Sequence, residues 1–409
     1  MPREKIVAMV MAGGEGSRLQ PLTSERSKPA VPFGGRYRIV DFVLSNLINS
    51  GIHAVYLLVQ YKSQSLIEHI ARAWVVSSTI PEQFITVVPP QMREGPEWFQ
   101  GTADAVYQNL NLMEYHDPTL VLVFGADHIY RMDICEMIAF HRNSGAQVTV
   151  AALPVPREQS TSFGVIAADA DGRVRGFQEK PQNPVVMPGR ESHVFASMGN
   201  YIFNADVLVK SVLEAKERGH SDFGHHVLPH LVDTHKVFAY DFSSNHVPGV
   251  RDYEEQAYWR DVGTIDAYFD ANQDVLGGEP RLNLFNPKWI VRSSGYQGPP
   301  AKIVDGTIRN SMLGAGTLIK GASITNSILR REILLEQDVE IEDCIIMDYV
   351  IIRRGAKLKR VIIDRYNNIE PNARIGFDRD ADSRNYFVTP SGISVLAKGA
   401  YTPEFTRYQ

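Results

Sequence analysis

Cysteine is scarce in this chain, and its scarcity excludes several kinds of protein. Cys135 and Cys344 are the only two cysteines among 409 residues. They stand far apart and without the spacing of metal ligands, so we interpret them as small buried apolar residues. A zinc site or a redox pair of thiols is not indicated.

Two further features are missing from the sequence. No apolar run approaches the length that crosses a membrane, and residues 1–5 lead into the first strand without an apolar signal segment. The 42 basic and 47 acidic residues form no long run of one sign, which disfavours nucleic acid as the main partner. We therefore expect a cytoplasmic protein with no membrane and no nucleic-acid partner.

The composition that remains is that of an ordinary globular protein. The chain is 44% hydrophobic and 22% charged, and its length is enough for two or three domains. In the first part, apolar runs alternate with helical patterns, which predicts an α/β fold with a doubly wound, mostly parallel sheet and sites at the carboxyl ends of its strands. The runs are 6–11, 54–59, 84–88, 120–125 and 148–153.

Helical spacing of apolar residues lies between these runs and again later in the chain. The expected helices are 38–47, 65–74, 102–115, 133–144, 205–216 and 265–276, with Thr102 as an N-cap. Beyond Pro154 the expected strands are shorter, at 164–167, 174–178 and 197–203, and this half should carry the second substrate. Residues 220–258 follow no clear pattern.

A stretch rich in glycine, proline, asparagine and serine surrounds Trp289 and is interpreted as a linker, 277–300. It separates an expected catalytic domain, 1–276, from a C-terminal domain, 301–409. In the latter, aliphatic residues recur with a loose period of six, which is typical of hexapeptide repeats that coil into a parallel β-helix. Because the period is imperfect, a small β-sandwich is the alternative.

A glycine-rich stretch, 12–19, directly follows the first apolar run. Its three glycines are Gly13, Gly14 and Gly16. They permit positive φ and leave backbone N–H groups uncovered, which favours an anion-binding concavity. The spacing matches neither G-x-G-x-x-G nor the P-loop motif, but Arg18 and Lys28 add charge that suits a polyphosphate. The alternative is a tight turn with a solvated arginine.

Several motifs together resemble one family. GGEGSRL at 13–19 followed by KPAVPFGG at 28–35 is similar to the signature of the sugar-1-phosphate nucleotidyltransferases, and in particular of the bacterial glucose-1-phosphate adenylyltransferases. The further motifs GADH at 125–128, FQEKP at 177–181 and WRDVGT at 259–264 follow in the family order. The resemblance runs from Lys5 to about Gly376 and implies a nucleotidyltransferase domain followed by a left-handed parallel β-helix.

The carboxylate Asp127 directly follows a buried run, where it suits Mg²⁺ together with substrate phosphates; an exposed turn aspartate is the alternative. The resemblance pairs it with Asp261 and implies that both residues hold the catalytic Mg²⁺. It also implies that Arg18, Lys28 and Asp127 are the catalytic residues.

For the sugar substrate, the resemblance implies that Glu179 and Lys180 bind glucose 1-phosphate, although a Glu-Lys pair alone would usually be solvated. Phe99, Gly164 and Ser197 match further positions of the sugar-phosphate site. Many relatives have tyrosine in place of Phe99, so only packing of its ring is expected here.

For the nucleotide, the resemblance implies that Gln91 and Gly101 join the three glycines of the loop. His225 and His226 stand near Asp222 without the spacing of metal ligands, so we interpret them as surface or packing residues.

The implied reaction joins ATP and glucose 1-phosphate to give ADP-glucose and pyrophosphate for bacterial glycogen or another α-glucan. Alternatives are a nucleotidyltransferase for another base or sugar, and a non-catalytic regulatory relative. An acyltransferase built on the β-helix is disfavoured because no transferase histidine is evident in the coil.

The resemblance also implies a homotetramer. Sugar-phosphate and adenine-nucleotide effectors are expected in a basic cleft between the two domains, with Arg26 and Arg38 as candidate effector residues. Glu25 stands where enteric relatives carry a lysine associated with fructose 1,6-bisphosphate, so a monophosphate effector is expected.

Overall fold

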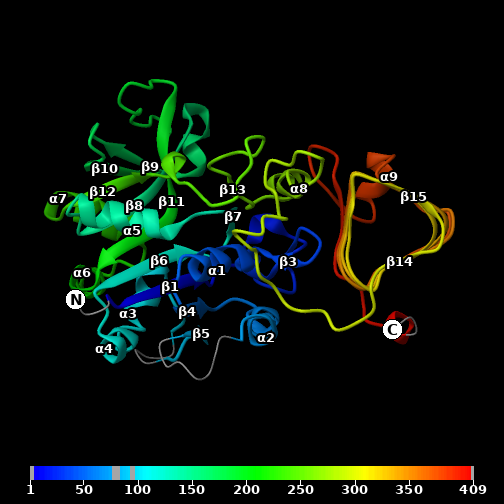
Figure 1. The fold of residues 1–409 in the computed structure, drawn as a ribbon, viewed down its shortest axis with the longest axis horizontal. Coiled ribbons are helices and arrows are strands. Elements are labelled where there is room, and N and C mark those ends of the chain that lie inside the picture. Colours follow the sequence, from blue (N-terminus) through cyan, green and yellow to red (C-terminus); the bar gives the residue numbers. More distant parts are fainter. Residues whose placement is uncertain (1–3, 76–82, 93–96, 407–409) are drawn as a thin grey trace.

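The computed structural model describes residues 4–75, 83–92 and 97–406. The chain forms an α/β sheet at one end and a three-sided coil of parallel strands at the other (Figure 1). Within the described ranges, no helix combines the length and the apolar character that a membrane span requires.

Within the described residues, the large sheet has nine strands, arranged in two halves. Strands β6, β1, β4 and β5 run parallel to one another in that order. Strand β11 is antiparallel to β6, β8 and β9, so the other half of the sheet is mixed. The strands are β1 Ile6–Ala12, β4 Ala54–Val59, β5 Phe84–Val88, β6 Leu120–Gly125, β8 Val148–Pro156, β9 Gly164–Ala168, β10 Val174–Glu179, β11 His193–Asn204 and β12 Val237–Asp241.

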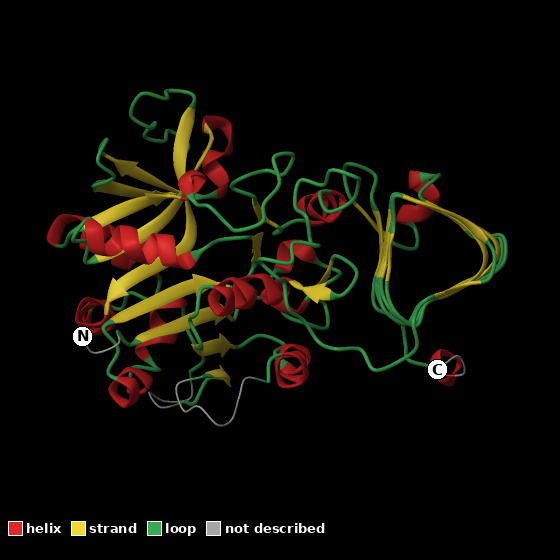
Figure 2. Cartoon of the chain, in the orientation of Figure 1, coloured by secondary structure: helices red, strands yellow, loops and turns green. Residues whose placement is uncertain are grey.

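Helices cover both faces of this sheet (Figure 2). Along β1, Ala8 and Val10 pack with α1, α2 and α5, whereas Met9 packs with α3, α6 and α7. Burial on both faces explains why β1 is a continuous apolar run in the sequence. The helices on both faces of the sheet confirm the doubly wound α/β fold. The helices are α1 Ile39–Asn49, α2 Gln64–Ala73, α3 Thr102–Tyr107, α4 Asn111–His116, α5 Ile134–Asn143, α6 Ala205–Glu217, α7 Leu228–Thr234 and α8 Ile265–Gln273.

Some local expectations are wrong. The single helix expected over 102–115 is two helices, α3 and α4, and the N-cap of α3 is Gly101. Thr102 instead donates its hydroxyl hydrogen to Asp222, at 3.0 Å. Cys135 is exposed, and only Cys344 is buried.

The C-terminal part is a parallel β-helix, left-handed as in hexapeptide-repeat proteins, which confirms the second half of the expected fold. Ile328 pairs with Ile345, and Ile345 pairs with Ile362, so aliphatic side chains stack from turn to turn. One sheet holds β14 Lys302–Ile303, β15 Gly306–Arg309, β17 Leu318–Thr325, β19 Leu334–Glu342, β21 Ile351–Ile352, β22 Lys357–Lys359, β24 Asn368–Ile369 and β25 Arg374–Ile375. The other holds β16 Met312–Leu313, β18 Ile328–Leu329, β20 Ile345–Ile346, β23 Val361–Ile363, β26 Phe387–Val388 and β27 Ser394–Leu396, and helix α9 spans Arg379–Ser383.

An apolar cluster joins the coil to the α/β part. Phe33, Phe42 and Tyr268 pack in it with Ile345 and Ile362 of the coil. The hairpin of β2 Pro32–Phe33 and β3 Tyr37–Arg38 lies at this contact. The connecting residues 277–300 contain no helix or strand, yet Trp289 is buried and its indole N–H donates to Asn46 at 3.0 Å. The coil is therefore packed against the α/β part.

Candidate active site

The glycine-rich stretch leaves the carboxyl end of β1 and turns sharply at Gly16. This residue has φ +66°, and its carbonyl accepts hydrogen bonds from the Thr23 hydroxyl and the Leu19 N–H, at 2.9 and 3.0 Å. A Cβ at this position would lie only 2.8 Å from the Cβ of Lys28. Glycine is therefore required both by the backbone conformation and by the close approach of the segment that carries Lys28.

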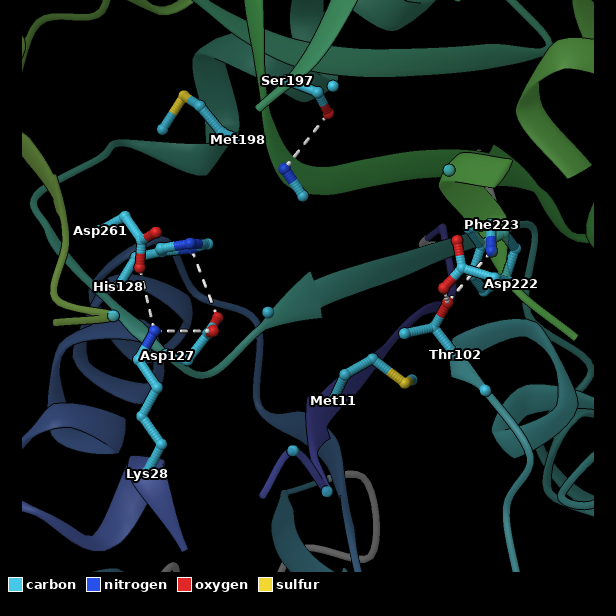
Figure 3. A pocket seen from close by; sticks show the side chains of 18 of the residues that line it. Met11, Lys28, Thr102, Asp127, His128, Ser197, Met198, Asp222, Phe223 and Asp261 are labelled. Atoms are coloured by element: carbon cyan, nitrogen blue, oxygen red, sulfur yellow. Dashed lines mark hydrogen bonds and ion pairs between the residues drawn. The ribbon is translucent and has the colours of Figure 1, made fainter. Parts of the chain in front are cut away.

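Lys28 connects the two predicted metal-binding carboxylates (Figure 3). Its Nζ donates to Asp127 Oδ2 and to Asp261 Oδ1, each at 3.0 Å. Asp127 lies between β6 and β7, His128–Tyr130, and Asp261 ends β13, Trp259–Asp261. Strand β13 pairs with β7 in a register that sets Asp261 opposite His128. This antiparallel pair brings together two aspartates that lie far apart in the sequence.

The charges of this cluster stabilise one another. Burial lowers the pKa of Lys28, but the charges of Asp127 and Asp261 outweigh it, so the net shift of this pKa is upward. Enclosure by protein raises the pKa of Asp127, but His128 and Lys28 outweigh that effect and hold the pKa well below its usual range. Asp127 is therefore a carboxylate, and Lys28 an ammonium, throughout the neutral range.

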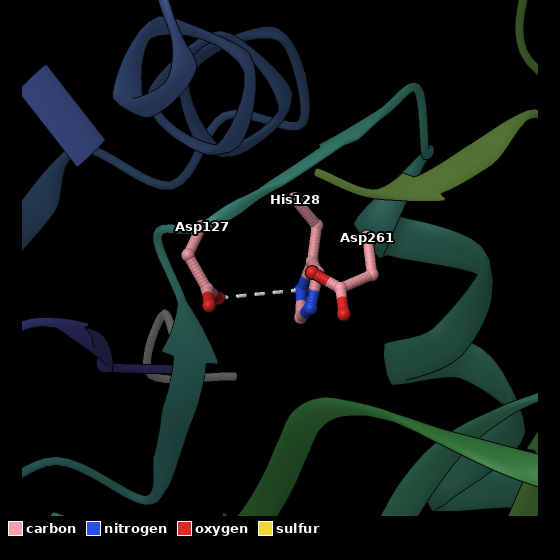
Figure 4. A group of neighbouring side chains, drawn as sticks. All are labelled: Asp127, His128 and Asp261. Atoms are coloured by element: carbon pink, nitrogen blue, oxygen red, sulfur yellow. Dashed lines mark ion pairs between the residues drawn. The ribbon is translucent and has the colours of Figure 1, made fainter. Parts of the chain in front are cut away.

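The same residues fit a divalent cation. One ligand atom each of Asp127, His128 and Asp261 lie within 4.8 Å of one another (Figure 4). The two carboxylates already converge on a cation, the Lys28 ammonium, and oxygen donors of this kind suit a hard divalent ion. The Nδ1 of His128 is buried, lies 3.5 Å from Asp127 Oδ1 and makes no hydrogen bond within the described part of the chain.

The predicted sugar-phosphate residues gather on the mixed half of the sheet. Glu179 ends β10 opposite Gly164 of β9, and its carboxylate lies 3.1 Å from Lys180 Nζ. A Cβ on Gly164 would lie 2.6 Å from the ring of Phe177 and 3.0 Å from Glu179 Oε2. Glycine at 164 therefore leaves room for the Glu179 carboxylate. The Ser197 hydroxyl accepts a hydrogen bond from the Gly199 N–H at 3.3 Å.

One cavity of about 670 Å³ includes nearly all of the predicted site residues. The predicted residues that line it are Gly13, Gly14, Gly16, Arg18, Lys28, Phe99, Gly101, Asp127, Gly164, Glu179, Lys180, Ser197 and Asp261. Gln91 does not line it; that side chain is exposed and donates to the Pro89 carbonyl at 2.8 Å.

The two candidate effector residues also lie outside this cavity. The Arg26 guanidinium is buried and paired with Asp364 at 2.8 Å. Arg38 donates to the carbonyl and the hydroxyl of Ser65, both at 2.8 Å.

Two residues that shape the cavity, Gln60 and Asp222, are not among the predicted site residues. Gln60, just after β4, donates to the Phe99 carbonyl at 3.1 Å and accepts from the Phe99 N–H at 2.7 Å, so it fixes the segment before α3. Asp222 lines the cavity beside Thr102 (Figure 3). A Cβ on Gly101 would lie 2.4 Å from the Ser221 carbonyl oxygen, so Gly101 permits this contact. The polar Gln60 after a buried strand was a usable signal, whereas residues 220–227 carried no periodic pattern.

Comparison with known proteins agrees with this geometry. The family pattern described as nucleotidyl transferase matches residues 7–278, and the pattern described as a GlmU-like C-terminal hexapeptide matches residues 299–396. The fold and the site thus define a nucleotidyltransferase, a class whose members generally use a divalent metal.

The most specific likeness is to full-length relatives. The chain is 56% identical over 397 residues to a glucose-1-phosphate adenylyltransferase of Thermodesulfovibrio yellowstonii, with 97% of each chain covered. It is 45% identical to one from an Anaeromyxobacter species (96% and 98% covered) and 42% identical to glucose-1-phosphate adenylyltransferase 1 of Vibrio parahaemolyticus (97% and 98% covered). The chain belongs to the glucose-1-phosphate adenylyltransferase family.

Proposed function

We propose that this protein transfers the adenylyl group of ATP to glucose 1-phosphate, which forms ADP-glucose and pyrophosphate. The observation that carries the proposal is the single cavity in which the glycine loop, the Lys28–Asp127–Asp261 cluster and the Glu179–Lys180 pair all meet. ADP-glucose is the glucosyl donor for bacterial glycogen, so the protein would act in glycogen synthesis. Both substrates are metabolites of the cytoplasm, and the proposal places the protein there.

In this reaction an oxygen of the sugar phosphate attacks the α-phosphorus of ATP in line. A new O–P bond forms, the bond from the α-phosphorus to the bridging oxygen of the β-phosphate breaks, and pyrophosphate leaves with the electron pair. The attacking phosphate is already ionised, so no side chain has to remove a proton. The protein therefore acts by positioning the reactants and neutralising charge.

In the proposal, different residues bind the two substrates. Arg18 and Lys28 contact the nucleotide phosphates in the proposal, beside the N–H groups of the glycine loop, Gly13, Gly14 and Gly16, and of Gly101. Lys180 binds the phosphate of the sugar, Glu179 accepts from a sugar hydroxyl, and Phe99, Gly164 and Ser197 complete that side. Gln91 remains a proposed nucleotide contact, although its side chain is exposed.

We propose Mg²⁺ as the divalent ion, held by Asp127 and Asp261. Mg²⁺ prefers a few carboxylates together with phosphate oxygens over a cage made only of protein. When bound, the ion neutralises charge on the phosphates as a Lewis acid.

The test is pyrophosphate release from ATP, GTP, CTP and UTP, each offered with glucose 1-phosphate and with several other sugar 1-phosphates. ATP with glucose 1-phosphate should be turned over fastest. A faster reaction with another nucleotide or sugar would assign the protein to a different pyrophosphorylase activity. No reaction with any pair would favour a non-catalytic regulatory relative.

The proposal includes two domains, 1–276 and 301–409, joined by 277–300, and a homotetramer. Ile303 and Val304 support the tetramer because these apolar side chains at the start of the coil are 51% and 61% exposed. Light scattering at micromolar concentration should give a mass four times that of the chain; a monomer would contradict the tetramer.

Arg26 and Arg38 stay candidate residues for sugar-phosphate and adenine-nucleotide effectors between the two parts of the molecule. Because Arg26 is already paired with Asp364, an anion would have to displace that carboxylate to reach it.

A further inference from the structure

One corner of the β-helix touches the segment that carries Lys28. Strand pairing aligns Leu329 with Ile346, and Ile346 with Ile363, on consecutive turns of the coil. The residues that follow these three therefore stack at one corner. They are Arg330, Met347 and Asp364, which we call the corner column, and all three contact residues 26–37 of the α/β part.

Asp364 binds Arg26, at the beginning of that segment. Both of its carboxylate oxygens accept from Arg26 Nη2 at 2.8 Å. The side chains of Arg26 and Asp364 are only 3% and 1% exposed, so this is a fully buried ion pair between two parts of the chain. On the same guanidinium, Nη1 lies 3.7 Å from the sulfur of Met347.

Arg330 donates hydrogen bonds to the end of the same segment. Its Nη1 donates to the backbone carbonyl of Tyr37 at 2.8 Å and to that of Phe33 at 3.4 Å. Its Nε donates to Asp348 at 2.9 Å, so the charge of this buried arginine is balanced within the coil. The corner column thus holds a charged side chain and two backbone carbonyls of the hairpin β2–β3.

Lys28 lies between these two points of attachment. It follows Arg26 by two residues and starts a short 3-10 helix, Lys28–Ala30, whose residues are all buried. Its ammonium donates to two carboxylates at 3.0 Å each. A preorganised charge stabilises a transition state only while its position in the site is maintained. The coil therefore contacts the chain on both sides of Lys28, at Arg26 and at residues 33–37.

We propose that Asp364 and Arg330 are positioning residues for catalysis: the corner column of the β-helix fixes the backbone of residues 26–37 and thereby holds Lys28 against Asp127 and Asp261. This inference rests on the proposed function, because it assigns a role in that reaction. It makes the β-helix a part of the catalytic apparatus. The competing interpretation is that the ion pair only fastens the coil to the rest of the chain.

Three variants of the full-length chain separate these interpretations. Asp364→Asn breaks the pair and leaves the Arg26 charge buried, which is expected to destabilise the fold. Arg26→Lys keeps the charge but loses the planar guanidinium, whose Nη2 contacts Asp364 and whose Nη1 contacts Met347. The double variant Arg26→Met with Asp364→Leu removes both charges and replaces them with apolar groups, a change that often restores stability. Glu336→Gln is the matched control, because it breaks an ion pair with Arg353 elsewhere on the coil.

Positioning predicts that kcat falls on the order of tenfold or more in all three variants, including the thermally stable double variant, because small displacements of a catalytic group are costly. KM for glucose 1-phosphate should change less than twofold, since Lys180 and Glu179 lie on the other half of the sheet. Glu336→Gln should keep native kcat. A double variant with native melting temperature and native kcat would overturn the proposal. The ion pair would then serve only to attach the coil to the rest of the chain.

Hydrogen–deuterium exchange gives a readout that does not depend on activity. In Arg26→Lys and in the double variant, the peptide covering residues 22–31 should exchange at least several-fold faster, while β4 exchanges as in the native protein. Unchanged exchange at 22–31 would also overturn the proposal. If the native protein makes no ADP-glucose, the proposed function fails, and the exchange experiment still decides whether the corner column holds the segment.

Discussion

Asp127 belongs to a cluster of ionisable side chains that lines the cavity. Its carboxylate contacts the Lys28 ammonium and lies beside His128, and Lys28 in turn binds Asp261. These contacts keep the carboxylate ionised, so its negative charge is available for a metal ion at any pH near neutrality. The function of this residue therefore depends on charge more than on shape.

Asp127→Asn tests that dependence, because asparagine keeps the shape and removes the charge. We expect turnover to fall on the order of 100-fold or more, as for the loss of one strong electrostatic contact in an active site. Steady-state kinetics at saturating Mg²⁺ measure it. The control is Asp338→Asn, an exposed aspartate of the coil. Near-native turnover of the Asp127 variant would remove this residue from the mechanism.

Lys180 is the residue proposed to bind the phosphate of the sugar substrate. Its side chain is 57% exposed and contacts only the neighbouring Glu179 among the ion pairs of the described residues, so it is available to a phosphate. Lys180→Gln should raise KM for glucose 1-phosphate about tenfold, a loss of roughly 1.4 kcal/mol of binding, and leave KM for ATP nearly unchanged. Arg175→Gln is the control, because Arg175 is 63% exposed and lies on β10, the strand that Lys180 directly follows. Equal weakening of both substrates would place Lys180 elsewhere.

The glycine loop shows how an element depends on one backbone position. Gly16→Ala should cost about 1 to 2 kcal/mol of stability because of its positive φ. It should also lower kcat, because the new methyl group would press on Lys28. Gly145 separates the two effects: it has φ +60° and no atom within 4 Å of an added Cβ. Gly145→Ala should therefore show only the fall in melting temperature that a positive φ causes, with native kcat, and equal kcat values for the two variants would contradict the contact with Lys28.

At this scale, the sequence predicts best those elements whose pattern is local. The apolar runs of β1, β4 and β6 are buried on both faces, so their identity is visible in consecutive residues. The break between α3 and α4 is not visible, because the residues around 108–110 keep a helical spacing. The contact of Thr102 is not predictable from nearby residues because its partner, Asp222, comes from a distant segment. Pairing of β7 with β13 is equally remote, and only the family motifs connected Asp127 with Asp261.

On the scale of the whole molecule, charged side chains just after the glycine loop contact the coil at two neighbouring positions. Besides the Arg26–Asp364 pair, Glu25 lies 3.8 Å from Lys398, which follows the last strand of the coil. The Glu25 side chain is 60% exposed and that of Lys398 is 28% exposed. This partly exposed pair is accessible to a dissolved anion, unlike the buried Arg26.

Glu25 therefore provides a test of the proposed effector site. Its carboxylate neutralises Lys398 and repels a second phosphate group, so fructose 6-phosphate or glucose 6-phosphate should activate the native protein more strongly than fructose 1,6-bisphosphate. Glu25→Lys places two ammonium groups at the same contact and should raise the response to the bisphosphate several-fold, because each phosphate then has a cation. Activation is titrated with each effector at sub-saturating ATP.

Glu114→Lys is the control. It makes the same charge change on α4, at the end of the molecule away from the coil (Figure 1), and should leave every response unchanged. Stronger activation of the native protein by the bisphosphate would mean that Glu25 does not face the effector.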